Sequence, residues 1–148
     1  MKRQALETIE NEVTDFIRRI VLSERRDGSL DRSSFVILRQ LTTHGPAGVK
    51  SLAKELNLDI STISRQAATL VDKQYVEKVP NPDDGRAFFY QITEPGEKML
   101  DENRKRRFAG LERALEEWTE EECESFAHLL KKYNHSVIKE KNKKQSNG

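Results

Sequence analysis

The sequence contains one cysteine, Cys123, so an intramolecular disulfide is excluded and the thiols are too few for a cysteine-based zinc finger. It also lacks any apolar run of about eighteen residues, and we therefore expect no membrane span. Residues 1–4 lead into a charged amphipathic stretch instead of an uninterrupted apolar one, which predicts no secretory signal. Cytoplasmic residence is the default expectation.

Motifs that support catalysis are absent as well. The sequence has no Gly-rich phosphate loop, no Gly-x-Ser-x-Gly element and no visible set of nucleophile, base and orienting group. Of the three histidines, His128 and His135 lie about 10 Å apart along a helix, whereas one zinc ion holds each nitrogen ligand at about 2 Å. His44 is distant in sequence. We therefore predict no catalytic residues, no metal site and no cofactor.

The balance of residue types favours a thin or shared core. Of the 148 residues, 35% are hydrophobic and 34% are charged, against about 25% charged in a typical globular domain. Such a chain fits thin helical layers, or a core that a second subunit completes. The net charge of +1 gives no general attraction to nucleic acid, so any case for DNA binding depends on local arrangement.

Hydrophobic periodicity predicts a mainly α-helical fold with one β-hairpin. Asp59, Thr93 and Thr119 are placed to cap helices, and Asp27-Gly28-Ser29 is expected to end the first helix. Residues 141–148 have almost nothing to bury and are predicted to form a disordered basic tail. The expected helices cover residues 4–26, 33 or 34 to 43, 51–56, 60–73, 94–115 and a last helix after 119, and the expected strands cover 75–80 and 87–93 around a long tip at 81–86.

Two short helices, at 51–56 and 60–73, are joined by a tight turn and form a helix-turn-helix signature. An inserted helix fits the major groove of B-DNA, which is about 12 Å wide, if it carries short polar side chains outward. Arg65 can read guanine with two hydrogen bonds or hold a phosphate. The alternative is an ordinary amphipathic helix with a solvated side. The apolar side is predicted to hold Ile60, Ile63, Ala67, Leu70 and Val71; Thr69 is among the residues opposite, and those directed at base edges are Ser61, Thr62, Arg65 and Gln66.

The hairpin that follows is predicted to be a wing. Arg86 near its tip suits a narrow minor groove, where the negative potential is focused. Asp84 is placed to orient Arg86, or another arginine, by a charge-assisted hydrogen bond. The alternative is a surface turn in which residues 83–85 simply bend the chain.

Two apolar stripes need a partner, and we do not expect a lone chain of this composition to cover both. We expect a two-fold dimer, which would set its recognition helices about 34–36 Å apart, one helical turn of DNA. The alternative is that the two helices pack on each other within a monomer. The stripes consist of Leu6, Ile9, Val13, Phe16 and Ile20 in the first helix, and of Phe126, Leu130, Tyr133 and Val137 in the last.

Three segments carry a specific combination of residues. They are Leu52-Ala53 to Leu56 with Ile63-Ser64-Arg65, then Tyr75 to Arg86, and then Ile92-Thr93-Glu94-Pro95-Gly96. The Asp-x-Arg pattern of the wing and the strand that ends in a hydrophobic-Thr-x-x-Gly step are the most specific features. With them, the chain resembles the MarR family of bacterial winged-helix transcription regulators over effectively its full length.

The resemblance implies a winged helix-turn-helix with N- and C-terminal dimerisation helices. Residues 1–30 would form the N-terminal dimerisation helix, 31–95 the DNA-binding lobe and 96–140 the C-terminal dimerisation helices. It further implies a homodimer that grips a palindromic operator in double-stranded DNA, and we expect the regulator to be a repressor. A small, often aromatic effector would bind between the dimer helices and the lobe, and would favour a spacing of recognition helices that no longer matches the operator.

At the level of residues, the resemblance places Ser64 and Arg65 at contact positions of the recognition helix. It places Asp84 and Arg86 at the wing positions. The family often carries a basic residue where this chain has Thr69. The helical wheel puts Ser64 near the edge of the buried side, and the sequence indicates no effector-binding residue.

Two other functions remain open at this point. A winged-helix adaptor would contact a protein partner, although it has no need to aim both Arg65 and Arg86 at grooves. One branch of the family senses hydroperoxides through a cysteine in the first helix, but here Cys123 lies elsewhere. The neighbouring glutamates of Cys123 disfavour its thiolate, so we expect a passive cysteine.

Overall fold

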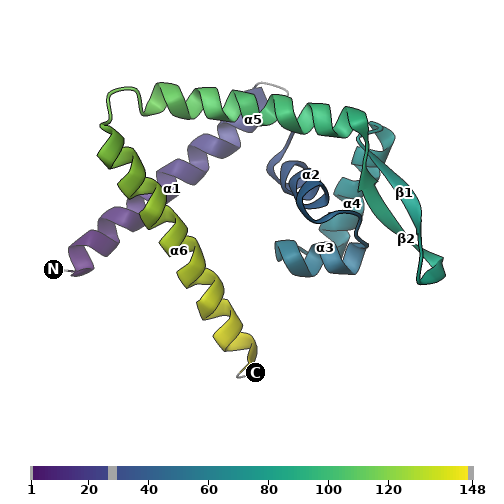
Figure 1. Ribbon diagram of the computed structural model, residues 1–148. Coiled ribbons are helices and arrows are strands. Elements are labelled where there is room, and N and C mark those ends of the chain that lie inside the picture. The colour runs from purple at the N-terminus through teal and green to yellow at the C-terminus, as the bar shows by residue number, and fades with distance from the viewer. Residues whose placement is uncertain (1, 27–29, 147–148) are drawn as a thin grey trace. The chain divides into compact units, whose positions relative to one another are not determined.

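The structure is a computed structural model that describes residues 2–26 and 30–146. Within these residues it has six helices and a two-stranded antiparallel sheet (Figure 1), which confirms the predicted fold class. The expected end of the first helix at Asp27-Gly28-Ser29 lies outside the described residues. The elements are α1 (Lys2–Arg26), α2 (Arg32–His44), α3 (Val49–Leu56), α4 (Ile60–Asp72), β1 (Val76–Asn81), β2 (Asp84–Ile92), α5 (Glu94–Ala114) and α6 (Glu120–Ser146).

The chain divides into two compact units, Met1–Lys105 and Arg106–Gly148. In the first unit, α2, α3, α4 and the hairpin form a lobe around one hydrophobic core (Figure 1). Each of these elements contributes at least one side chain that is almost completely buried. The core consists of Leu30, Phe35, Ile37, Leu38, Leu41, Leu52, Ala53, Ile63, Ala67, Leu70, Val76, Tyr90 and Leu100.

Local signals in the sequence set the helix ends in this lobe. The Asp31 carboxylate accepts a hydrogen bond from the Ser34 N–H at 2.8 Å and so caps the start of α2. Gly45, with φ of +86°, ends α2. Asn57 ends α3 in the left-handed conformation, with φ of +53°. Asp59 stands at the predicted cap position of α4, but its side chain makes no capping hydrogen bond.

The hairpin tip is shorter than predicted, because β2 begins at Asp84 and not at residue 87. Asn81 pairs with Asp84 beyond an irregularity at Pro80/Asn81, which leaves two residues between the strands. The Asn81 side-chain oxygen accepts a hydrogen bond from the Asp83 N–H at 2.9 Å. This local bond closes the chain so tightly that residues expected in a loop pair as strand.

The root of the hairpin is joined to α5 through Thr93 and Gly96. The Thr93 hydroxyl donates to the Gln74 carbonyl at 2.6 Å and accepts from the Gly96 N–H at 3.1 Å, so it caps α5 as predicted. A Cβ on Gly96 would lie 2.1 Å from the Tyr75 carbonyl oxygen. Only glycine allows this close approach, which explains the hydrophobic-Thr-x-x-Gly step.

The tail prediction for residues 141–148 is wrong for its described part, because α6 continues to Ser146. No proline or glycine interrupts residues 120–146, and lysines at the C-terminal end of a helix interact favourably with its dipole. At the other end, Thr119 and Glu122 exchange two hydrogen bonds, of 3.0 and 3.1 Å, in a capping box. No helix among the described residues combines the length and apolarity that a bilayer crossing requires.

We predict that Gly96→Ala destabilises the lobe by about 1–3 kcal/mol, because the new methyl group must displace backbone. Gly110→Ala, later in α5, is the matched control: its Cβ would meet only the Arg113 side chain, at 3.9 Å. There the better helix propensity of alanine should stabilise by up to about 1 kcal/mol. Urea unfolding followed by circular dichroism measures both, and equal stability of Gly96→Ala and wild type would contradict the close-approach account.

Candidate nucleic-acid interface

One side of α4 is packed into the lobe and the other is open. Ile63 and Ala67 are 0% exposed and Leu70 is 1% exposed, as the helical pattern predicts. The open side carries most of the predicted contact residues. Ser61, Ser64, Arg65 and Thr69 are exposed, and Thr62 is half-buried.

Two residues at the start of α4 differ from their expected burial. Ile60 is 53% exposed although the wheel placed it on the apolar side, because the first residue of the helix extends past the core. Ser64, which the wheel placed at the edge of the buried side, is exposed. The beginning of α4 therefore presents more of its surface to solvent than the sequence indicates.

Gln66 lies on the side of α4 that contacts α2. Its side-chain oxygen accepts a hydrogen bond from the hydroxyl of Ser34, which is 4% exposed, at 3.3 Å. Gln66 is itself half-buried. The Thr69 hydroxyl, in contrast, donates to the Arg65 carbonyl within α4 at 3.2 Å and stays on the exposed side. Gln66 thus holds α4 in place, while Thr69 keeps its hydroxyl oxygen available as an acceptor.

The wing tip is organised by its main chain. The Asp84 carboxylate accepts a hydrogen bond from the Arg86 main-chain N–H at 3.0 Å. Within the described part of the chain, no ion pair joins Asp84 to a guanidinium, so the predicted charge-assisted hydrogen bond to Arg86 is made through its main-chain N–H and not through its side chain. Asp84 therefore fixes the backbone from which Arg86 projects, and the exposed Arg86 guanidinium stays without a carboxylate partner there.

The root of the wing is anchored through β2, on the edge of that strand that does not pair with β1. Tyr90 and Ala47 exchange two main-chain hydrogen bonds of 2.8 and 3.1 Å, which makes Ala47 a one-residue third strand just before α3. Tyr90 is 5% exposed, and burial raises the pKa of its hydroxyl because desolvation disfavours the phenolate. The hairpin is thereby tied to the helix-turn-helix at its base.

A cation on the wing escaped the sequence reasoning. Lys78 Nζ lies 4.5 Å from the centre of the Phe88 ring, and Phe88 packs edge-on against Tyr90 with the ring centres 5.4 Å apart. Strand alternation would have placed Lys78 on the same side as Val76. The register that brings it to Phe88 is separated from the tip by the irregularity at Pro80/Asn81, which the sequence did not predict.

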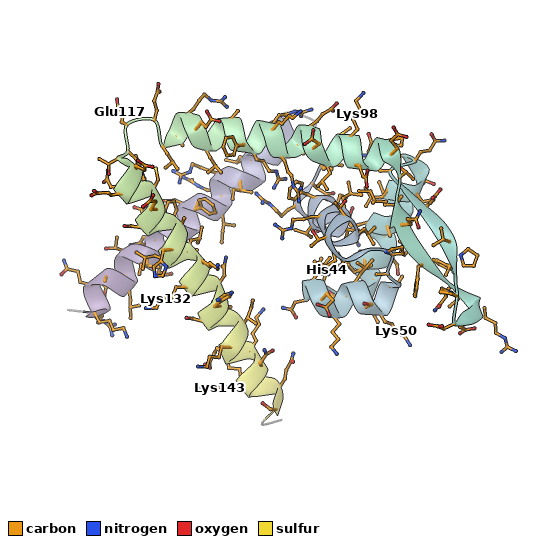
Figure 2. The ribbon with its side chains drawn as sticks, in the orientation of Figure 1. His44, Lys50, Lys98, Glu117, Lys132 and Lys143 are labelled. Atoms are coloured by element: carbon orange, nitrogen blue, oxygen red, sulfur yellow. The ribbon has the colours of Figure 1, made fainter. Side chains whose placement is uncertain are left out.

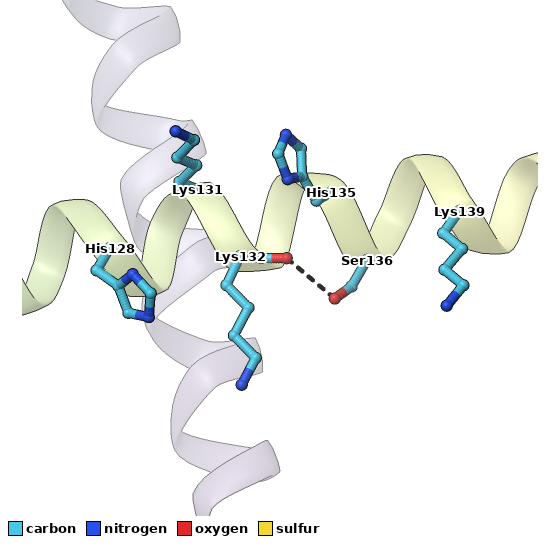
Figure 3. A pocket seen from close by; sticks show the side chains of 6 residues that line it. All are labelled: His128, Lys131, Lys132, His135, Ser136 and Lys139. Atoms are coloured by element: carbon cyan, nitrogen blue, oxygen red, sulfur yellow. Dashed lines mark hydrogen bonds between the residues drawn. The ribbon is translucent and has the colours of Figure 1, made fainter.

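The remaining candidates lie on α6. His128 and His135 belong to a cationic face that also carries Lys131, Lys132, Ser136 and Lys139 (Figure 3). Among the described residues, no group of three or more His, Cys, Asp or Glu side chains is placed to hold a metal ion. Cys123 is half-buried in the first turn of α6, between Glu122 and Glu124. Its passive role stays a prediction.

The comparisons with known proteins agree on one family. The family model described as MarR family matches residues 30–88, which include α2, α3, α4 and most of the hairpin. The "uncharacterized HTH-type transcriptional regulator YxaD" of Bacillus subtilis (strain 168) is 45% identical over 136 residues, covering 90% of this chain and 95% of the relative. This chain belongs to the MarR family. It is a DNA-binding transcriptional regulator of the helix-turn-helix type, and its family and fold are not those of enzymes.

Solved structures of MarR proteins share the fold. A MarR family protein from Bacillus stearothermophilus has a TM-score of 0.77 at 20% identity, over 93% of this chain and 99% of that chain. Wild-type MarR from E. coli, in its apo form, has a TM-score of 0.70 at 22% identity, over 86% and 96% of the two chains. MarR family regulators bind DNA and act as dimers.

The wing of this MarR-family chain allows a test of how Asp84 acts. We predict that Asp84→Asn retains DNA affinity within about twofold, because the amide oxygen still accepts the Arg86 N–H. Asp84→Ala should lose affinity by about three- to tenfold, since losing a hydrogen bond that fixes the tip costs about 1 kcal/mol. Fluorescence anisotropy on a duplex selected by the wild-type protein measures both. Equal losses in the two variants would show that the charge of Asp84 matters and not its hydrogen bond.

Proposed function

We propose that this chain is a homodimeric repressor that binds a palindromic operator in double-stranded DNA. The observation that supports it best is that one lobe carries two unpaired guanidinium groups, one on each of the two elements that would contact DNA. Arg65 is on the open side of α4 and Arg86 is at the wing tip, and neither forms an ion pair among the described residues. An arginine without a carboxylate partner remains free to bind phosphate or guanine.

In this proposal, the first half of α4 enters the major groove. Ser61, Thr62 and Ser64 offer short hydroxyls to base edges or phosphates. Arg65 reads a base with two hydrogen bonds, and the Thr69 hydroxyl rotates away from the Arg65 carbonyl to donate to a backbone phosphate. We assign Gln66, which the sequence placed among the base-reading residues, to the support of α4 because of its bond to Ser34.

The wing enters the adjoining minor groove. Arg86 is drawn by the negative potential there, and Asp84 keeps the tip in the conformation that projects it. Because Asp84 fixes the backbone and Arg86 makes the contact, an acidic residue is tolerated at a tip that faces DNA. Its carboxylate is occupied by a main-chain N–H and supports the cation that makes the contact.

Dimerisation through α1 and α6 is supported by their open apolar stripes. Leu6, Phe16 and Tyr133 are 53–54% exposed, and α6 has no buried residue. Exposed apolar faces of this length mark a protein interface. The predicted residues Leu6, Ile9, Val13, Phe16 and Ile20 on α1, and Phe126, Leu130, Tyr133 and Val137 on α6, would be covered by the second copy.

Control by a small, often aromatic effector completes the proposal, and the family resemblance supports it. Such a molecule would bind more tightly to the dimer conformation whose lobe spacing does not match the operator, and would shift the population toward it. Because the target is chromosomal DNA, we place the protein in the cytoplasm.

Replacing Arg65 separates base reading from phosphate binding. We predict that Arg65→Ala weakens binding to a selected duplex by about 1–3 kcal/mol, with a much smaller loss on a duplex of scrambled sequence. Arg86→Ala should weaken binding while the melting temperature is unchanged, because its side chain is exposed and forms no ion pair among the described residues. Titrations on both duplexes measure this, and an equal Arg65→Ala loss on both would make Arg65 a phosphate contact.

A charge on the α6 stripe should break the dimer. We predict that Leu130→Glu raises the dimer dissociation constant by at least about tenfold, because it would bury an unpaired carboxylate. His128→Glu is the matched control, since about 100° per residue places it on the opposite side of α6. Light scattering should give the mass of two chains for wild type and His128→Glu. A wild-type mass of one chain at micromolar concentration would contradict the dimer.

A further inference from the structure

We propose that Lys78 is a further DNA-binding residue, which Phe88 holds ready for a backbone phosphate on the inner side of the wing. The inference rests on the proposed DNA-binding function and adds a contact between its two reading elements. None of the predicted contact residues covers this part of the hairpin.

The lysine is ordered by an aromatic ring and not by an acid. Its Nζ lies 4.5 Å from the centre of the Phe88 ring, within the range of a cation–π interaction. No carboxylate of the described residues forms an ion pair with Lys78. The nearest acid in sequence, Glu77, accepts a hydrogen bond from the Gln91 side chain at 3.3 Å. The ammonium is therefore held in direction while its charge stays uncompensated.

The ring itself is held in place by the core of the lobe. Phe88 is 40% exposed and meets Tyr90 edge-on, with an angle of 84° between the ring planes. Tyr90 is buried and fixed to Ala47 by two main-chain hydrogen bonds. The position of Lys78 is thus set by a continuous series of contacts that ends in the rigid part of the lobe.

The register of the hairpin shows which side Lys78 lies on. Val76 pairs with Ile92, Lys78 with Tyr90 and Pro80 with Phe88, so these residues share one face of the sheet. At the root, Val76 and Tyr90 bury this face against the lobe, where β1 contacts α4. Further along, the same face is exposed at Lys78. Lys78 is therefore on the lobe-facing side of the wing, between the root and Arg86.

Duplex geometry gives this position a partner. If α4 lies in the major groove and Arg86 in the adjoining minor groove, one sugar–phosphate strand separates the two. That strand must pass along the inner side of the hairpin, where Lys78 projects. A phosphate there would be bound without regard to sequence and would fix the register of the lobe on the duplex.

The test is the salt dependence of binding to a labelled duplex that the wild-type protein selects from a random pool. Each neutralised phosphate contributes about 0.9 to the slope of log affinity against log salt concentration. We expect Lys78→Ala to reduce the slope by about 1.8, one contact for each subunit of a dimer. Lys98→Ala, the matched control on α5, should leave the slope unchanged. Figure 2 shows Lys98 on the opposite side of the lobe from Lys50 of α3, the first helix of the helix-turn-helix, so Lys98 is expected to lie away from the DNA.

Two further variants test the role of the ring. Lys78→Arg should keep the wild-type slope, because a guanidinium also binds phosphate and stacks on an aromatic face. Phe88→Leu keeps the charge and the apolar bulk, so we expect the slope to stay and the affinity to fall by about two- to fivefold. Circular dichroism melts check that each variant is folded.

The outcomes distinguish a failure of the Lys78 contact from a failure of the proposed DNA-binding function. An unchanged slope in folded Lys78→Ala, alongside lost binding in Arg86→Ala, would overturn the Lys78 contact and leave the proposed function standing. Full affinity in Phe88→Leu would overturn the positioning role of the ring. If the wild-type protein selects no duplex at all, both proposals are wrong.

Discussion

Three side chains of α4, Ile63, Ala67 and Leu70, are packed into the core of the lobe, and this packing determines which residues face outward. Rotating the helix would remove them from the core, at a cost of about 2 kcal/mol for a fully buried aliphatic side chain. The hydrogen bond between Gln66 and Ser34 adds a polar contact on the same side. The open side is therefore specified by the core, and its residues can vary without loss of the fold.

The wing depends on the same core through a separate anchor. Tyr90 is bonded to Ala47 just before α3, and Thr93 and Gly96 hold the far end of β2 against residues 74 and 75. Because both reading elements are fixed to one lobe, their separation is set in the monomer. In the proposed dimer, the stripes on α1 and α6 would instead set the distance between the two lobes. A regulator built in this way can change its fit to DNA by moving whole lobes without changing the surfaces that read the groove.

Much of the fold was predictable because its signals are local. Periodicity gave the helices, the Thr93 and Thr119 caps gave two of the helix starts, and the step that ends at Gly96 gave the turn into α5. What sequence reasoning missed depends on contacts between distant residues. Gln66 is bound to Ser34, thirty-two positions earlier, and no helical wheel can show this. The role of Asp84 depends on the tip conformation. Residues 141–146 were misjudged because they bury nothing, yet α6 continues through them with no proline or glycine to interrupt it and with lysines that suit the C-terminal end of its dipole.

The central claim is that two lobes each place α4 in a major groove and a wing in the adjoining minor groove of one duplex. Hydroxyl-radical footprinting on a duplex selected by the protein tests this most directly, because it reports the protected sugars along both strands. The account predicts two protected regions related by two-fold symmetry, with centres about 10–10.5 base pairs apart. A single asymmetric region, or protection spread evenly along the duplex, would contradict it.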